Sequence, residues 1–145
     1  MPTHKQVEVV AQLGERFTIE SKIRDHVLYV DQPKAAGGED AGPTPLELLF
    51  LSLGACVGSI GRIIANQRRL PLRSMEVKVI GSLDVETLMG KSQENRAGFG
   101  GMRVIVKMDA DMTKDEKEKF LHDIDARCPV SDNLKTLTPV SFEVE

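Results

Sequence analysis

Two cysteines are the residues of this 145-residue sequence best suited to covalent chemistry. Cys128 stands directly before Pro129 in "DARCPVSDNLK", residues 125–135. Proline is favoured at the first position of a helix, so the pattern predicts a short helix with Cys128 at its N-cap. Backbone N–H groups and the positive end of the helix dipole would then favour the thiolate. The alternative is a small apolar residue at a turn.

Cys56 lies in the most apolar segment of the chain, "LLFLSLGACVGSIG", residues 48–61. Taken alone, it would be an inert residue of the core. If Cys56 and Cys128 meet in space, one thiolate could attack an oxidant and the other could resolve the sulfenic acid as a disulfide. The separation of the two residues in the sequence neither supports nor excludes this contact.

Glu47 is the third candidate residue, and a capping role accounts for it fully. Thr44, Pro45 and Glu47 form a capping box that opens a helix. On that helix Glu47 would be half a turn out of phase with Cys56 and about 13.5 Å away along the axis. Glu47 should therefore not touch Cys56 of its own chain, and it would reach a cysteine site only across a dimer interface.

Composition and motifs argue against several other classes of function. His4, His26 and His122 have no paired metal-ligand spacing with each other or with the cysteines. There is no GxSxG nucleophile elbow and no phosphate-binding glycine loop. A net charge of −3 and an aromatic content of 4% do not favour nucleic acid as a partner.

The expected location is cytoplasmic, with no membrane partner. The beginning of the chain, "MPTHKQVEVV", lacks the apolar centre of a signal peptide. The apolar run 48–61 is short for a bilayer span and is closed by Arg62. In a reducing cytosol the two cysteines are better suited to reactivity than to a permanent disulfide.

Hydrophobic patterning predicts an antiparallel meander followed by a long helix. Residues 6–12, 16–23 and 26–31 have strand character, with turns at 14–15 and 24–25. The helix should run from 45 to 68 and be mostly buried. Its small residues Gly54, Gly58 and Gly61 predict close contact, either with the same helix of a second subunit or with a helix of the same chain.

The second half predicts strands at 74–83 and 101–110, joined by an exposed loop at 84–101. Thr113 and Glu116 form another capping box, opening a helix with Phe120, Leu121 and Ile124 inward. The short helix after Cys128 and a closing strand at 139–145 complete the order βββ-α-ββ-α-α-β. With no linker or repeat, residues 1–145 are expected to form one domain.

Two segments carry a resemblance to a known family. "GGEDAGPTPLELLFLSLGAC" resembles the region of the first cysteine, and "CPVSDNL" the second cysteine motif, of the OsmC/Ohr family (osmotically inducible protein C and organic hydroperoxide resistance proteins), within its OsmC-like branch. The resemblance implies an α+β fold, an intertwined homodimer with long central helices packed between sheets. It also implies an antioxidant role in oxidative stress.

By this resemblance the protein would be a peroxidase that reduces organic hydroperoxides. Cys56 would attack the peroxide, Cys128 would resolve the product through a disulfide, and Glu47 would help organise the site. No metal, haem or flavin would be needed, because the two thiols carry the electrons. An external dithiol or thiol would regenerate the protein, and a lipoylated protein is one candidate.

Two alternatives remain beside the peroxidase. Peroxidases of the family use an arginine to hold the attacking cysteine as a thiolate. Here Arg16 and Arg24 are available, but neither lies in a matching pattern. Without such an arginine, the same dimer could bind a hydrophobic small molecule near Cys56 without catalysis. A redox sensor is the other alternative, with the loop 84–101 as its only candidate contact surface.

Overall fold

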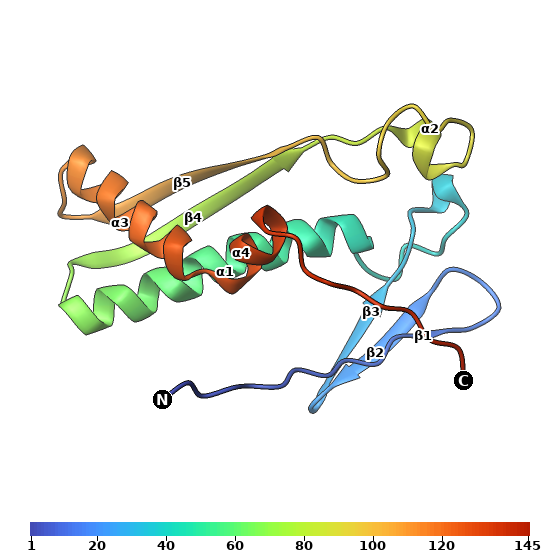
Figure 1. Ribbon diagram of the computed structural model, residues 1–145, viewed down its shortest axis with the longest axis horizontal. Coiled ribbons are helices and arrows are strands. Elements are labelled where there is room, and N and C mark those ends of the chain that lie inside the picture. The colour runs from blue at the N-terminus through green and yellow to red at the C-terminus, as the bar shows by residue number, and fades with distance from the viewer. The chain divides into compact units, whose positions relative to one another are not determined.

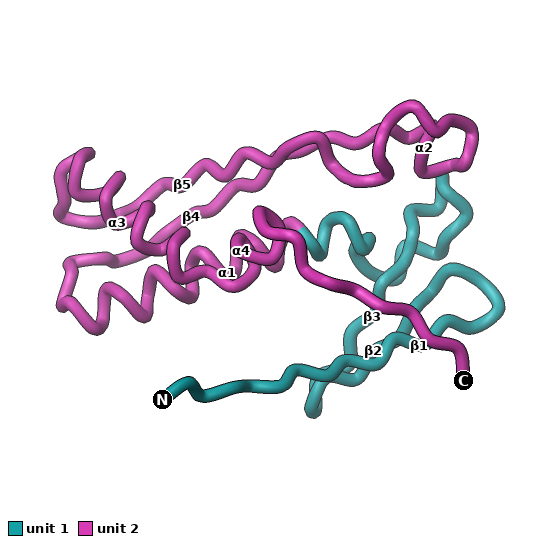
Figure 2. The backbone as a smooth tube through the Cα atoms, viewed as in Figure 1, with its two compact units in different colours: residues 1–49 teal, residues 50–145 magenta.

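The computed structural model describes residues 1–145, and the chain divides into two compact units, residues 1–49 and 50–145 (Figure 2). The division falls inside helix α1 (Pro45–Arg68), whose first turn belongs to the first unit. Each unit is described by itself. The expectation of one domain over the whole chain stays a prediction.

The first unit contains the predicted antiparallel meander. Strands β1 (Gln12–Leu13), β2 (Ile19–Ile23) and β3 (His26–Val30) form one sheet in that order (Figure 1). The turn between β2 and β3 is tight, because Ile23 pairs with His26 and Arg24 adopts a positive φ of 56°. The strand expected at 6–12 is wrong for most of its length. Its valines have no strand partner in the chain and stay exposed.

Asp31 organises the loop that leads from this sheet to α1. Its carboxylate is only 1% exposed, and it accepts a hydrogen bond from the hydroxyl of Thr18 at 2.8 Å. It also accepts the backbone N–H groups of Gln32, Glu39 and Ala41. These bonds fix the path of the chain through the short 3-10 helix Lys34–Ala36 to the start of α1. The glycine- and proline-rich segment is therefore an ordered connection.

The second unit is built on a long antiparallel hairpin of β4 (Leu72–Gly81) and β5 (Met102–Ala110). Helix α1 runs beside β4, and α3 (Lys114–Arg127) and α4 (Pro129–Lys135) follow β5 in the chain (Figure 1). The buried core draws on α1, β4, α3 and the α3–α4 corner. Its members are Leu53, Val57, Ile64, Ala65, Leu72, Phe120, Ile124 and Cys128.

The small-residue strip of α1 packs against its own chain at two of its three positions. A Cβ on Gly54 would lie 3.7 Å from the side chains of Val77 and Val79 in β4. A Cβ on Gly61 would lie 3.0 Å from Met75 and 3.2 Å from Ile124 in α3. Gly58 has open space beside it. Contact with a helix of the same chain is thus confirmed at Gly61, and the symmetric dimer stays a prediction.

Helix α1 is less buried than its apolar sequence predicts. Leu51 is 63% exposed, and only 28% of the most apolar 18-residue window is buried. By length and composition alone this helix could cross a membrane. Its 24 residues extend beyond the apolar run 48–61, and the helix remains apolar on average although it includes Arg62. Core helices of soluble proteins meet the same criterion. The exposed apolar face therefore indicates a surface that this single chain does not cover.

One further expectation is corrected in the second unit. Residues 139–145 form no strand and no ladder, and Phe142 is 94% exposed. The chain supplies no partner strand for this segment. The exposed loop 84–101 contains the short helix α2 (Val85–Leu88), capped by Asp84. Phe99 of this loop packs against Phe50 of α1, with the two ring centroids 4.6 Å apart.

Candidate functional site

Cys128 forms the corner between two helices, as its position before a proline predicts. It is both the C-cap of α3 and the N-cap of α4, with Pro129 at the first helical position. Its backbone N–H donates to the carbonyl of Asp125 at 3.3 Å, which closes the end of α3. Its sulfur accepts the backbone N–H of Ser131 at 3.5 Å, which opens α4. The predicted N-cap is confirmed.

Cys56 and Cys128 are neighbours. Cys56 projects from α1 against the core cluster that contains Cys128, and the two thiols interact. Both cysteines are free. Cys128 is 1% exposed, whereas Cys56 is partly exposed. The structure thus joins the two residues whose contact the sequence left open, and it makes Cys56 the one that solvent can reach.

The electrostatic surroundings of Cys128 favour the neutral thiol. Burial raises the pKa of this thiol, and its interaction with Cys56 raises it further. The backbone N–H groups of Ser131 and Val130 act in the opposite direction. The expectation that the helix start makes Cys128 a thiolate is therefore wrong, because loss of hydration outweighs the helix N-terminus.

A polar cluster surrounds the corner and was not foreseen from the sequence. The hydroxyl of Ser131 donates to Asp125 Oδ1 at 2.5 Å, and Lys135 forms an ion pair with the same carboxylate. The hydrogen bond from Lys135 and then that from Ser131 hold the pKa of Asp125 below its usual value. The available signal was local, an acidic residue three before the cysteine and a serine three after it.

Glu47 forms the capping box that its spacing predicts. Its carboxylate Oε1 accepts the backbone N–H of Thr44 at 2.9 Å, and its own N–H donates to the Thr44 hydroxyl at 3.2 Å. The hydrogen bonds with Thr44 lower the pKa of Glu47. Glu47 is exposed and belongs to the first unit, while both cysteines belong to the second. Its catalytic role stays a prediction.

The two candidate arginines also lie in the first unit. Arg16 forms an ion pair with Glu39 at 3.1 Å, and Arg24 occupies the tight turn between β2 and β3. No ion pair joins either of them to Glu47. Within this chain, therefore, neither candidate arginine pairs with Glu47.

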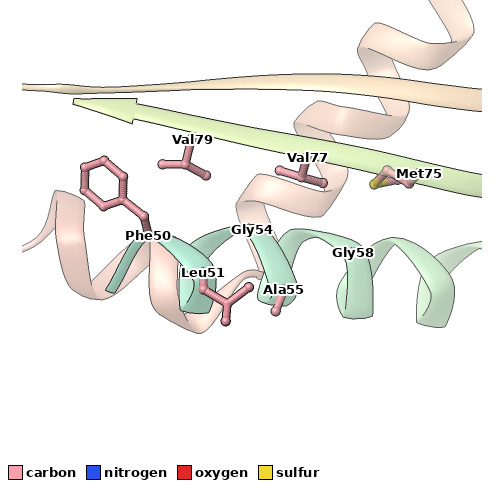
Figure 3. Close-up of a pocket in the computed structure, with 8 residues that line it drawn as sticks. All are labelled: Phe50, Leu51, Gly54, Ala55, Gly58, Met75, Val77 and Val79. Atoms are coloured by element: carbon pink, nitrogen blue, oxygen red, sulfur yellow. The ribbon is translucent and has the colours of Figure 1, made fainter. Parts of the chain in front are cut away.

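An apolar groove lies between α1 and β4, with a volume of about 410 Å³ (Figure 3). It is lined by Phe50, Leu51, Gly54, Ala55, Gly58, Met75, Val77 and Val79. Neither cysteine lines it. Cys56 is two residues from Gly54 and from Gly58, which places it on the opposite side of the helix. The apolar groove and the thiol pair are thus separate features of α1.

Solved structures of several proteins resemble this chain. An OsmC-like protein from Mycoplasma pneumoniae aligns with a TM-score of 0.80 at 18% identity, covering 93% of this chain and 91% of the other. An organic hydroperoxide resistance protein OsmC from Legionella pneumophila aligns with a TM-score of 0.68 at 21% identity, covering 91% and 92%. An organic hydroperoxide resistance protein from Elizabethkingia anophelis gives 0.70 at 19%, covering 94% and 93%.

These structural alignments establish the α+β fold that the sequence predicted. No curated protein gives a significant sequence match. The family of OsmC-like proteins, however, matches residues 37–143, a span that contains Glu47 and both cysteines together with the segments in which they lie. The chain therefore belongs to the OsmC-like protein family.

Proposed function

We propose that this protein is a homodimeric thiol peroxidase that reduces organic hydroperoxides, with Cys56 as the attacking residue and Cys128 as the resolving residue. The observation that carries the proposal is the contact between a partly exposed Cys56 and a buried Cys128. Structurally similar proteins from Legionella pneumophila and Elizabethkingia anophelis are named organic hydroperoxide resistance proteins.

The chemistry needs only the two sulfurs. The Cys56 thiolate attacks the terminal oxygen of the hydroperoxide, the O–O bond breaks, and the alkoxide leaves and is protonated to the alcohol. Cys56 is now a sulfenic acid. The sulfur of Cys128 then attacks the sulfur of Cys56, the S–O bond breaks, and the hydroxide leaves as water with the proton of the Cys128 thiol. One hydroperoxide is reduced for each pair of thiols oxidised.

The surroundings of the two cysteines suit these roles. The attacking sulfur must meet a substrate from solution, and Cys56 is the more exposed of the two. The resolving sulfur meets only its partner, so burial of Cys128 does not obstruct it. A Cys128 that keeps its proton until the second step also supplies the proton that the departing hydroxide requires.

The remaining roles belong to the assembled protein. A second chain would cover the exposed apolar face of α1 and the unpaired segments 6–11 and 139–145. The exposed Glu47 would then be available to organise a thiol site across the interface. No bound cofactor is invoked, and an external dithiol or thiol, such as a lipoylated protein, would reduce the disulfide in the cytoplasm.

A non-catalytic dimer that holds a hydrophobic small molecule is the second candidate. The observation that favours it is the open groove of about 410 Å³ beside Gly54 and Gly58, whose lining residues are all apolar or glycine. This groove is separate from the thiol pair. Ligand binding there would therefore be unchanged by Cys56→Ser, whereas peroxidase activity would be lost.

The deciding experiment is a single turnover of the reduced protein with cumene hydroperoxide, compared with hydrogen peroxide. We expect rapid loss of one equivalent and formation of a Cys56–Cys128 disulfide. Cys56→Ser should abolish both the loss of hydroperoxide and the formation of the disulfide. Cys128→Ser should still consume one equivalent of hydroperoxide but should accumulate the sulfenic acid on Cys56. Consumption no faster than by a free thiol would refute the peroxidase and leave the binding protein.

A further inference from the structure

Asp125 connects α3 to both ends of α4. Its Oδ1 accepts the hydroxyl proton of Ser131 in the first turn of α4, and its Oδ2 pairs with Lys135 in the last turn. Its backbone carbonyl accepts the N–H of Cys128 at 3.3 Å. One residue of α3 thus contacts the start, the end and the corner of the following helix.

Ser131, which is hydrogen-bonded to Asp125, also contacts the sulfur of Cys128. Ser131 is 6% exposed, and while its hydroxyl is held by Asp125, its backbone N–H donates to Cys128 Sγ at 3.5 Å. A helix of seven residues is too short to be stable by itself, so α4 depends on such tertiary contacts for its position. The orientation of the Cys128 sulfur therefore depends on where Asp125 holds α4.

Disulfide formation is sensitive to this orientation. The bond requires Cβ atoms about 3.5–4.5 Å apart and a dihedral angle near 90°, so a displaced helix would separate the sulfurs or misalign them. In the structure the reduced thiols already interact. A fixed corner lets the sulfur of Cys128 reach that of Cys56 without rebuilding the helix start.

We propose that Asp125 is a positioning residue that, through Ser131 and Lys135, holds Cys128 Sγ in the orientation from which it attacks the sulfenic acid on Cys56. The proposal rests on the proposed peroxidase function and assigns the control of its second step. In that step the S–S bond forms, the S–O bond of the sulfenic acid breaks, and water leaves. Asp125 does not touch the reacting sulfurs, so its effect is confined to this step.

The test compares Asp125→Ala with Asp123→Ala. Both carboxylates lie on α3, with side chains 41% and 39% exposed, and each pairs with a basic side chain of another helix. Asp123 pairs with Arg68 of α1 and forms no hydrogen bond or ion pair with α4. The two substitutions therefore remove similar surface ion pairs, and only one of them releases α4.

We expect Asp125→Ala to slow disulfide formation about tenfold, because α4 loses its contacts to Asp125 through both Ser131 and Lys135. The first loss of cumene hydroperoxide should be unchanged, and dimedone should trap more sulfenic acid on Cys56. Asp123→Ala should behave as the wild type in all three measurements. An unchanged rate in Asp125→Ala, or equal slowing by Asp123→Ala, would overturn the proposal.

Two further measurements keep the test decisive. If Asp125→Ala does not fold, Ser131→Ala and Lys135→Gln each remove one of its contacts and should each slow the same step; wild-type rates in both would overturn the proposal. Equilibration with a glutathione redox buffer measures Cys56–Cys128 bonding without any hydroperoxide. If the wild type forms a stable Cys56–Cys128 disulfide in this buffer but consumes no hydroperoxide, the peroxidase function alone is refuted. If the equilibrium constant for this disulfide is the same in Asp125→Ala as in the wild type, the positioning role is refuted.

Discussion

Cys56 lies against Cys128 in the core of the second unit, although the first residue belongs to a long helix and the second to the corner between two later ones. Only Cys56 has appreciable exposure. The pair is thus asymmetric before any reaction begins, because Cys56 is partly exposed and Cys128 is buried.

This asymmetry predicts the order of alkylation. Iodoacetamide added to the reduced protein at neutral pH should modify Cys56 first, because Cys128 is buried and its raised pKa keeps the thiol protonated. Peptide mapping by mass spectrometry over time would measure both rates. In urea, where burial is lost, the two rates should converge. Preferential labelling of Cys128 in the folded protein would contradict the assignment of the buried thiol.

The close packing at Gly61 predicts a loss of stability on enlargement. A Cβ there lies 3.0 Å from Met75 and 3.2 Å from Ile124, so Gly61→Val should lower the free energy of unfolding by about 1–3 kcal/mol. Urea unfolding would measure the change. Gly58→Ala is the matched control, because its Cβ meets open space and alanine favours a helix by up to about 1 kcal/mol. Equal losses in both variants would exclude packing at Gly61 as the cause.

The buried Asp31 predicts a dependence of stability on pH. Burial alone would raise the pKa of this carboxyl, but hydrogen bonds from Gln32, Ala41, Thr18 and Glu39 hold it below its usual value. Its stabilising contribution is therefore fully present above the ordinary aspartate pKa of about 3.9, and it is lost as pH falls through the lowered value. Asp31→Asn should destabilise the protein at neutral pH.

The difference between wild type and Asp31→Asn should shrink as the solution is acidified. Urea midpoints measured between neutral pH and a pH of about 3 would follow it. Asp40→Asn is the control, since Asp40 is exposed and its positive φ of 56° is accessible to asparagine. A constant difference over the whole range would show that ionisation of Asp31 does not contribute.

The contact between Phe99 and Phe50 predicts that this ring pair contributes to the order of the loop 84–101. Phe99→Ala should remove an aromatic pair worth about 0.5–1.5 kcal/mol and raise amide hydrogen exchange within 84–101. Leu88→Ala changes a largely exposed side chain of the same loop and should leave exchange unchanged. Exchange at the wild-type rate in Phe99→Ala would mean that other contacts hold the loop.

The features predicted correctly from the sequence are those specified by neighbouring residues. The capping boxes of Thr44 with Glu47 and of Thr113 with Glu116 form as their spacing predicts. Cys128 is the N-cap before Pro129 for the same reason. In each case the hydrogen-bonding groups are at most three residues apart, so no tertiary information is needed.

The features that could not be predicted correctly depend on interaction partners that are distant in the sequence or absent from this chain. Segments 6–11 and 139–145 alternate as strands do, but a strand needs a neighbour, and this chain provides none. The contact of Cys56 with Cys128 depends on the packing of α1 against the α3–α4 corner, which no local pattern specifies. Burial at that corner also decided the protonation of Cys128, against the local effect of the helix start.

The burial of Cys128 also determines how an oxidised protein could be recycled. Once a disulfide joins the two cysteines, we expect an incoming reductant to reach Cys56, which is partly exposed, before Cys128, which is buried. The mixed disulfide must therefore form on Cys56, with Cys128 as the leaving group. A thiol of raised pKa is a slow leaving group. Reduction of the disulfide should therefore require a strongly reducing thiol that is small enough to reach Cys56.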